Sequence, residues 1–241
     1  MATSPASLSP SSSSSSASLP ALLLLLSATT GLVDAASVLG LGKVFTANMT
    51  GNIVFLGFAA VGTPGFKVAP FVVAIFTFML GAVIAGRMGA AHVAGPLRQW
   101  LIRAAIVETT LLWIAAAIAL LLHVPNQDPQ WAVFAIIALT AIAMGFRNAT
   151  VRQLKVPDLT TTVLTLTVTG IAADSKLAGG AGANLGRRIG AIASIFAGAA
   201  AGAVLVTRTG LTAPLALAGA MVLVGTLVCA RHPNAALPRS A

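Results

Sequence analysis

TANMTGN, at residues 46–52, is a dense polar run in a chain that is 57% hydrophobic. A long apolar segment precedes the run, and a short apolar segment at residues 53–61 follows it. The short segment cannot cross a hydrocarbon core of about 30 Å as a helix, because a crossing takes about 20 residues. The long segment also carries Asp34, an ionisable residue at bilayer depth. The pattern predicts a membrane protein that folds around a broken segment.

The composition supports this class. Only 8% of the 241 residues are charged and the mean hydropathy is +0.96, so the chain cannot supply the polar surface of a soluble domain. Long runs rich in Ala, Leu and Gly favour an all-α polytopic membrane protein over a β-barrel, which has short alternating strands. The net charge of +9 comes from basic residues between apolar segments, a pattern typical of loops that face anionic lipid. We therefore expect the lipid bilayer, and no nucleic acid, as a partner.

Three parts are predicted along the chain. Residues 1–18 read as a disordered Ser-rich tail, residues 19–232 as a single transmembrane domain, and residues 233–241 as a short cytoplasmic tail. A signal peptide is the competing interpretation, since residues 22–26 resemble its apolar core. The first residues carry no positive charge, however, so an uncleaved first helix is preferred.

Six spans and two short segments are expected. The spans are predicted near residues 19–41, 69–89, 104–122, 131–146, 188–206 and 215–230. The short segments are residues 53–61 and 163–173, and the second follows Asp158, a candidate N-cap, and the run Thr160-Thr161-Thr162.

An internal duplication is predicted between residues 19–123 and 131–232. The two halves align at three positions, pairing Gly31, Asp34 and Ala35 with Gly145, Asn148 and Ala149. The alternative is that membrane helices share small residues for packing alone. If both short segments dip in and return, eleven basic residues lie on one side and three on the other; if both cross, the division is eight to six. The positive-inside rule favours six transmembrane helices plus two short re-entrant or broken segments, with both termini cytoplasmic and an inverted repeat.

Asp34 is the strongest candidate for a functional residue, because a carboxylate at bilayer depth requires a polar partner or a functional role. One interpretation is a proton or cation site, with a set of polar residues that bind substrate or ion: Asp34, Asn48, Thr50, Asn52, Asn148, Thr161 and Thr162. The other is a structural hydrogen bond to the unwound backbone of the polar run. Glu108 is expected near an interface, beside Arg103. Arg147 is expected to be a cytoplasmic anchor, with a cavity position opposite Asp34 as the alternative.

Stripes of small residues at four-residue spacing predict close helix packing. The glycines expected at these contacts are Gly31, Gly81, Gly145, Gly190, Gly198 and Gly202. The chain has no phosphate-binding loop and no Ser/His/Asp grouping, so we expect no enzyme and no catalytic residue. A single cysteine, Cys229, and three scattered histidines predict no metal site and no cofactor.

Several motifs together resemble the YoaK-like family of bacterial integral membrane proteins, a domain of unknown function. They are Gly31-Leu32-Val33-Asp34-Ala35, residues 45–52, Met144-Gly145 with Asn148-Ala149, and Val156-Pro157 with Thr160-Thr161-Thr162. The resemblance implies a multi-pass protein of the bacterial inner membrane and no established activity. The chain departs from the family at Arg147, where an uncharged polar residue is usual.

Two functional hypotheses follow. The first is a small secondary transporter or permease with a polar midplane site for an unknown small solute or ion, proton-coupled through Asp34. The alternative is a non-transporting structural or accessory membrane protein whose polar runs only lock helix packing. Both hypotheses are compatible with an oligomer.

Overall fold

The computed structural model describes residues 18–91, 95–154, 164–180 and 184–231, and within these ranges the chain is helical without strands. Six helices are long: α1 (Ser18–Gly40), α3 (Val68–Ala91), α4 (Leu97–Ala119), α5 (Gln130–Leu154), α7 (Leu185–Thr209) and α8 (Thr212–Ala230). Two are short: α2 (Met49–Ala60) and α6 (Leu164–Ala173). Single 3-10 turns, Val124–Asn126 and Lys176–Ala178, precede α5 and α7. Each long helix has the length and apolarity to cross a membrane, so the predicted all-α polytopic class is confirmed.

Two predicted boundaries are wrong. Helix α4 begins at Leu97 rather than near residue 104, and α5 continues to Leu154 rather than ending near residue 146. Each predicted boundary lies beside a basic residue, Arg103 or Arg147, but the helix continues past it. Arg103 sits in the second turn of α4, where a long side chain can extend toward the membrane surface. Arg147 lies inside α5 and is buried.

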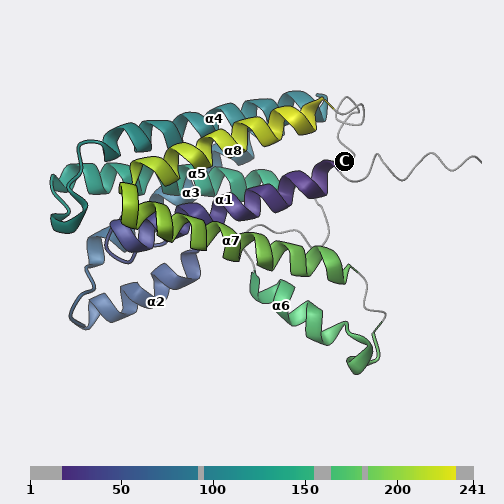
Figure 1. The fold of residues 1–241 in the computed structure, drawn as a ribbon, viewed down its shortest axis with the longest axis horizontal. Coiled ribbons are helices and arrows are strands. Elements are labelled where there is room, and N and C mark those ends of the chain that lie inside the picture. Colours follow the sequence, from purple (N-terminus) through teal and green to yellow (C-terminus); the bar gives the residue numbers. More distant parts are fainter. Residues whose placement is uncertain (1–17, 92–94, 155–163, 181–183, 232–241) are drawn as a thin grey trace, which may run out of the picture.

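The directions of the helices follow from which residues touch. Helices α1 and α7 run parallel, because Gly31 lies against Ile195 and, further along both helices, Leu32 lies against Gly202. Helix α8 runs antiparallel to α1, since its start at Leu211 contacts Gly40. The other half shows the same relation, because α3 and α5 run parallel and α4 and α5 are joined by a compact turn and run in opposite directions (Figure 1).

These directions fix where the short helices lie. Helix α1 ends, and α3 begins, at one end of the bundle, whereas α5 ends and α7 begins at the opposite end (Figure 1). Helices α2 and α6 therefore return to the end from which the chain left the bundle, instead of crossing it. Each starts near mid-bundle and points outward, α2 toward one end and α6 toward the other (Figure 1).

Four glycines approach backbone carbonyl groups of a neighbouring helix, and their contacts form two matched sets. At the α1–α7 crossing, a Cβ on Gly31 would overlap the Ile195 carbonyl oxygen, and one on Gly198 would overlap that of Ala28. At the α3–α5 crossing, Gly145 and Gly81 make the equivalent contacts with the carbonyls of Phe78 and Ile142. Gly145 and Ile142 lie 114 residues after Gly31 and Ala28, and Gly198 and Ile195 lie 117 residues after Gly81 and Phe78. The two crossings therefore use the same kind of glycine–carbonyl contact, at nearly constant offsets along the chain.

The two other glycines expected at helix contacts pack less uniformly. A Cβ on Gly202 would come within 2.8 Å of the Leu32 carbonyl oxygen, whereas one on Gly190 would make ordinary contact with the Leu24 side chain at 3.5 Å. Helices α1 and α5 are the two most buried spans.

Candidate functional site

Asp34 holds the backbone of the polar run. Its Oδ1 accepts hydrogen bonds from the backbone N–H of Thr46, at 3.1 Å, and of Ala47, at 2.9 Å. The chain reaches this position by a turn after Gly40, where Gly42 and Lys43 take φ values of 86° and 65°. Non-helical backbone at membrane depth needs partners inside the protein. Asp34 supplies an acceptor for two of these amide groups, which is the structural role weighed against the proton-site role.

Asn52 completes the local network. Its side chain is 0% exposed, its Oδ1 accepts from the Phe45 N–H at 2.9 Å, and its Nδ2 donates to the Phe45 carbonyl at 2.6 Å. One amide side chain therefore satisfies both backbone groups of the residue just before the run. The side chains of Asn48 and Thr50 are exposed instead. The structure thus brings Asp34 and Asn52 to the same short stretch of backbone and turns Asn48 and Thr50 away from it.

Phenylalanine side chains attach α2 to α3. The ring of Phe55 lies 5.2 Å from Phe66, 5.9 Å from Phe71 and 6.0 Å from Phe45, measured between centroids. Lys43 places its Nζ 4.8 Å from the centre of the Phe66 ring, a cation–π geometry. The broken segment is therefore fixed by apolar contacts on one side and by Asp34 and Asn52 on the other.

The second short helix is attached differently. Arg188 of α7 donates from Nη1 to the Gly170 carbonyl at 2.5 Å and pairs with Asp174 at 2.7 Å, which ties the end of α6 to α7. Asn148 lies half-buried on α5, 114 residues after Asp34. The expected N-cap Asp158 and the site residues Thr161 and Thr162 lie outside the described residues.

A buried ion pair joins α4 and α5, and the expectations for both residues are wrong. Glu108 pairs with Arg147 rather than lying at an interface beside Arg103, and Arg147 is buried rather than serving as a surface anchor. Glu108 is 4% exposed and Arg147 is 1% exposed. Arg147 donates to Glu108 Oε1 from Nε, at 2.6 Å, and from Nη2.

Arg147 also reaches α1. Its Nη1 donates to the Leu26 carbonyl at 3.0 Å and to Thr30 Oγ1 at 3.1 Å. One guanidinium therefore links three helices. Moving two charges out of water costs free energy unless good geometry and further hydrogen bonds offset the loss of hydration. Here the Glu108 carboxylate and two oxygen atoms of α1, the Leu26 carbonyl and Thr30 Oγ1, provide these interactions.

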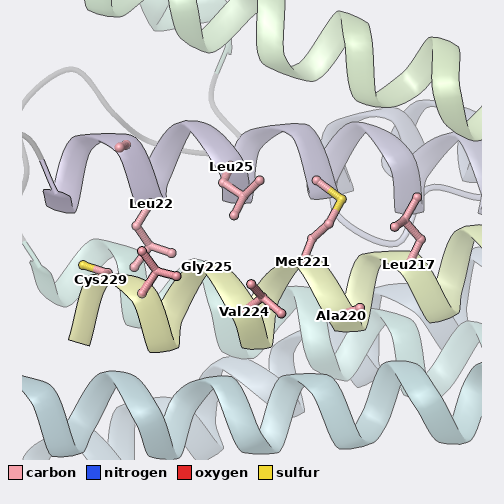
Figure 2. Close-up of a pocket in the computed structure, with 10 residues that line it drawn as sticks. Leu22, Leu25, Leu217, Ala220, Met221, Val224, Gly225 and Cys229 are labelled. Atoms are coloured by element: carbon pink, nitrogen blue, oxygen red, sulfur yellow. The ribbon is translucent and has the colours of Figure 1, made fainter. Parts of the chain in front are cut away.

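A small cavity lies beside this pair. Its volume is about 20 Å³, and its polar lining consists of Glu108, Arg147, Thr150 and Thr226. Leu22, one of its apolar lining residues, also lines a second and larger space. That space is an apolar groove of about 750 Å³ between α1 and α8, where Leu22 and Leu25 face Met221, Val224 and Gly225 (Figure 2).

The sequence predicted a polar site at Asp34 and did not predict the ion pair between Glu108 and Arg147. The signal was present, since Asp34 and Glu108 are the two acidic residues inside the long apolar segments and a lone carboxylate there requires a partner. Extending α5 beyond Phe146 would have put Arg147 inside a span as the complementary charge. Within the described ranges, no three His, Cys, Asp or Glu side chains gather in a geometry that could hold a metal ion.

Comparison with known proteins gives one family and one curated relative. A family model described as "Protein of unknown function (DUF1275)" matches residues 22–228. The UPF0700 transmembrane protein YoaK of Bacillus subtilis (strain 168) is 33% identical over 154 residues, which is 64% of this chain and 65% of the relative. No solved structure matches the chain. Because the family model covers most of the sequence, the chain belongs to the DUF1275 family of membrane proteins related to YoaK.

Proposed function

We propose that this protein is a small secondary transporter whose functional centre is the Glu108–Arg147 pair. The observation that carries the proposal is a pair of opposite charges, each at least 96% buried, that joins α4, α5 and α1. Ionisable residues inside membrane spans are costly, and they commonly mark substrate and ion pathways or proton relays. Asp34, whose Oδ1 accepts two backbone N–H groups, is assigned a structural role instead.

The depth of the pair supports this assignment. Glu108 lies eleven residues from each end of α4, which at 1.5 Å per residue is about 16 Å from either end. Half of a hydrocarbon core of about 30 Å is about 15 Å. The carboxylate therefore belongs to the middle of the span, the level at which secondary transporters bind substrate and coupling ion.

The proposed inverted repeat has its own support. The α1–α7 and α3–α5 crossings use equivalent residues at offsets of 114 and 117, and the short helices α2 and α6 point to opposite ends of the bundle. We infer that the two halves are related by a pseudo-two-fold axis in the membrane plane, the relation found in many transporters. When buried Arg147 is left out of the count, ten basic residues lie on one side of the membrane and three on the other. The positive-inside rule therefore still favours cytoplasmic termini. We propose the bacterial inner membrane as its location, because the curated relative is a transmembrane protein of a bacterium and the spans are helical.

The test starts with a ligand screen. Purified protein in nanodiscs is heated with a library of small metabolites and ions, because a ligand that binds the folded state raises its apparent stability. Each hit is then followed into proteoliposomes with and without an imposed pH gradient. Gradient-driven uptake of a hit supports the proposal, whereas uptake that ignores the gradient contradicts proton coupling.

Two neutralising variants locate the coupling group. Glu108→Gln removes one span carboxylate, and Asp34→Asn, the matched control, removes the other. We expect Glu108→Gln to abolish the dependence of uptake on the pH gradient and Asp34→Asn to keep it. The double variant Glu108→Gln/Arg147→Gln guards against misfolding, since it leaves no unpaired charge. The reverse result would return the coupling role to Asp34.

A non-transporting structural protein is the second candidate. The specific observation in its favour is the size of the cavity beside the pair, about 20 Å³, which holds one water-sized molecule rather than a metabolite. In this case the pair would only lock α4, α5 and α1 together. No hit in the screen, combined with no proton movement in proteoliposomes, would favour this candidate.

A further inference from the structure

The cavity beside Glu108 and Arg147 has the size of a hydration site. Its volume of about 20 Å³ exceeds the roughly 10–15 Å³ that one water needs. It lies between α1, α4, α5 and α8, each of which contributes residues to its lining. The space suits one small molecule and no more.

The polar lining supplies the partners that a buried water needs. Thr150 is 6% exposed, and its Oγ1 has no hydrogen-bond partner among the described residues. A buried hydroxyl without a hydrogen bond destabilises the folded protein, because its loss of hydration is not compensated. Glu108 and Thr226 line the same cavity and carry oxygen atoms that can bond to a water. Buried waters make about 2–4 hydrogen bonds to such groups, whereas cavities lined only by apolar residues stay dry.

We propose that this cavity binds one ordered water molecule, hydrogen-bonded to the Thr150 hydroxyl and to the Glu108 carboxylate. The water would connect Thr150 of α5 to Glu108 of α4, the acidic member of the ion pair. Its role rests on the proposed function. Arg147 donates and cannot accept, so a protonated Glu108 could not direct its O–H to the guanidinium. The water oxygen would accept that hydrogen bond, which makes the neutral form of Glu108 tolerable without moving Arg147.

The test compares two threonines on α5. Thr150→Val removes the hydroxyl that faces the cavity. Thr140→Val, the control, removes a buried hydroxyl that donates to the Ile136 carbonyl of its own helix at 2.6 Å. High-resolution structures in nanodiscs should contain a density peak within hydrogen-bond distance of position 150 and Glu108 in the wild type and in Thr140→Val. The peak should be lost in Thr150→Val. A wild-type map that resolves other internal waters but not this one overturns the proposal, as does a peak that Thr150→Val leaves unchanged.

Infrared difference spectra separate this proposal from the transport proposal. An internal water gives an O–H stretching band that shifts in ¹⁸O-water, and we expect Thr150→Val to lose that band while Thr140→Val keeps it. Protonation of Glu108 gives a carboxyl C=O band that Glu108→Gln removes. A water band without a titrating carboxyl band supports the hydration site and contradicts proton coupling at Glu108. Absence of the water band in the wild type overturns the hydration site whatever the carboxyl does.

Discussion

Helices α1 and α5 make equivalent crossings but carry opposite charges. Gly31 and Gly145 contact α7 and α3 in the same way, at positions 114 residues apart. Around these glycines the chemistry diverges, because α1 has Asp34 and α5 has Arg147. Asp34 bonds to backbone dipoles, whereas Arg147 bonds to a full opposite charge on α4. The glycine crossings therefore define the fold, whereas the charges define two different kinds of site.

The largest effect is expected from breaking the ion pair. Arg147→Met leaves Glu108 buried without its counter-charge, and removing one partner of a buried pair costs about 3–5 kcal/mol. Replacing both partners, in Glu108→Leu/Arg147→Met, should recover most of that loss because no charge then remains buried. Reversible denaturation in detergent micelles measures both. If the double variant is as unstable as the single one, the pair is not the cause.

The α1 carboxylate should tolerate neutralisation better. Asp34→Ala removes the acceptor of the Thr46 and Ala47 amides, and we expect a loss of about 2–3 kcal/mol from two unsatisfied buried donors. Asp34→Asn retains an acceptor oxygen and should lose about 1 kcal/mol. Hydrogen exchange at Thr46 and Ala47 checks the cause, since protection of these two amides should fall in Asp34→Ala and persist in Asp34→Asn. Equal losses for the two variants would mean that the charge itself matters at this position.

Hydropathy and charge predicted the architecture, because both depend only on the order of residues along the chain and not on tertiary contacts. The six spans, the two short segments and the break after α1 follow from the length of the apolar runs and from the polar run at residues 46–52. The predicted boundaries of α4 and α5 are wrong because a basic residue does not by itself end a span; an Arg that is paired, or that extends to the membrane surface, can lie within one.

The site could not be derived in the same way. Glu108 and Arg147 are 39 residues apart and on different helices, so their pairing depends on how α4 and α5 rotate about their axes. Asn52 was read as a ligand-binding group, but its amide bonds to the backbone of Phe45, seven residues earlier. Side-chain direction is set by packing that a single sequence does not display.

The shared crossing predicts equal effects in the two halves. Gly31→Ala and Gly145→Ala each push a methyl group into a carbonyl of the neighbouring helix, and we expect each to cost about 1–3 kcal/mol through forced separation of the helices. Gly57→Ala on α2 is the control, since a Cβ there meets nothing within 4 Å. Thermal denaturation should rank both crossing variants well below the control. A large difference between Gly31→Ala and Gly145→Ala would argue against equivalence of the halves.

The smallest effect tests the direct link between α1 and α5. Thr30 accepts a hydrogen bond from Arg147 at 3.1 Å and donates to the Leu26 carbonyl, whereas the adjacent buried Thr29 bonds within α1. Thr30→Val should therefore cost about 1 kcal/mol more than Thr29→Val, because only the first breaks a bond to a charged group. In the Arg147→Met background the difference should disappear, as a double-mutant cycle would measure. If it persists there, Thr30 stabilises α1 alone, and the charge on α5 is held by Glu108 and the Leu26 carbonyl without help from the hydroxyl.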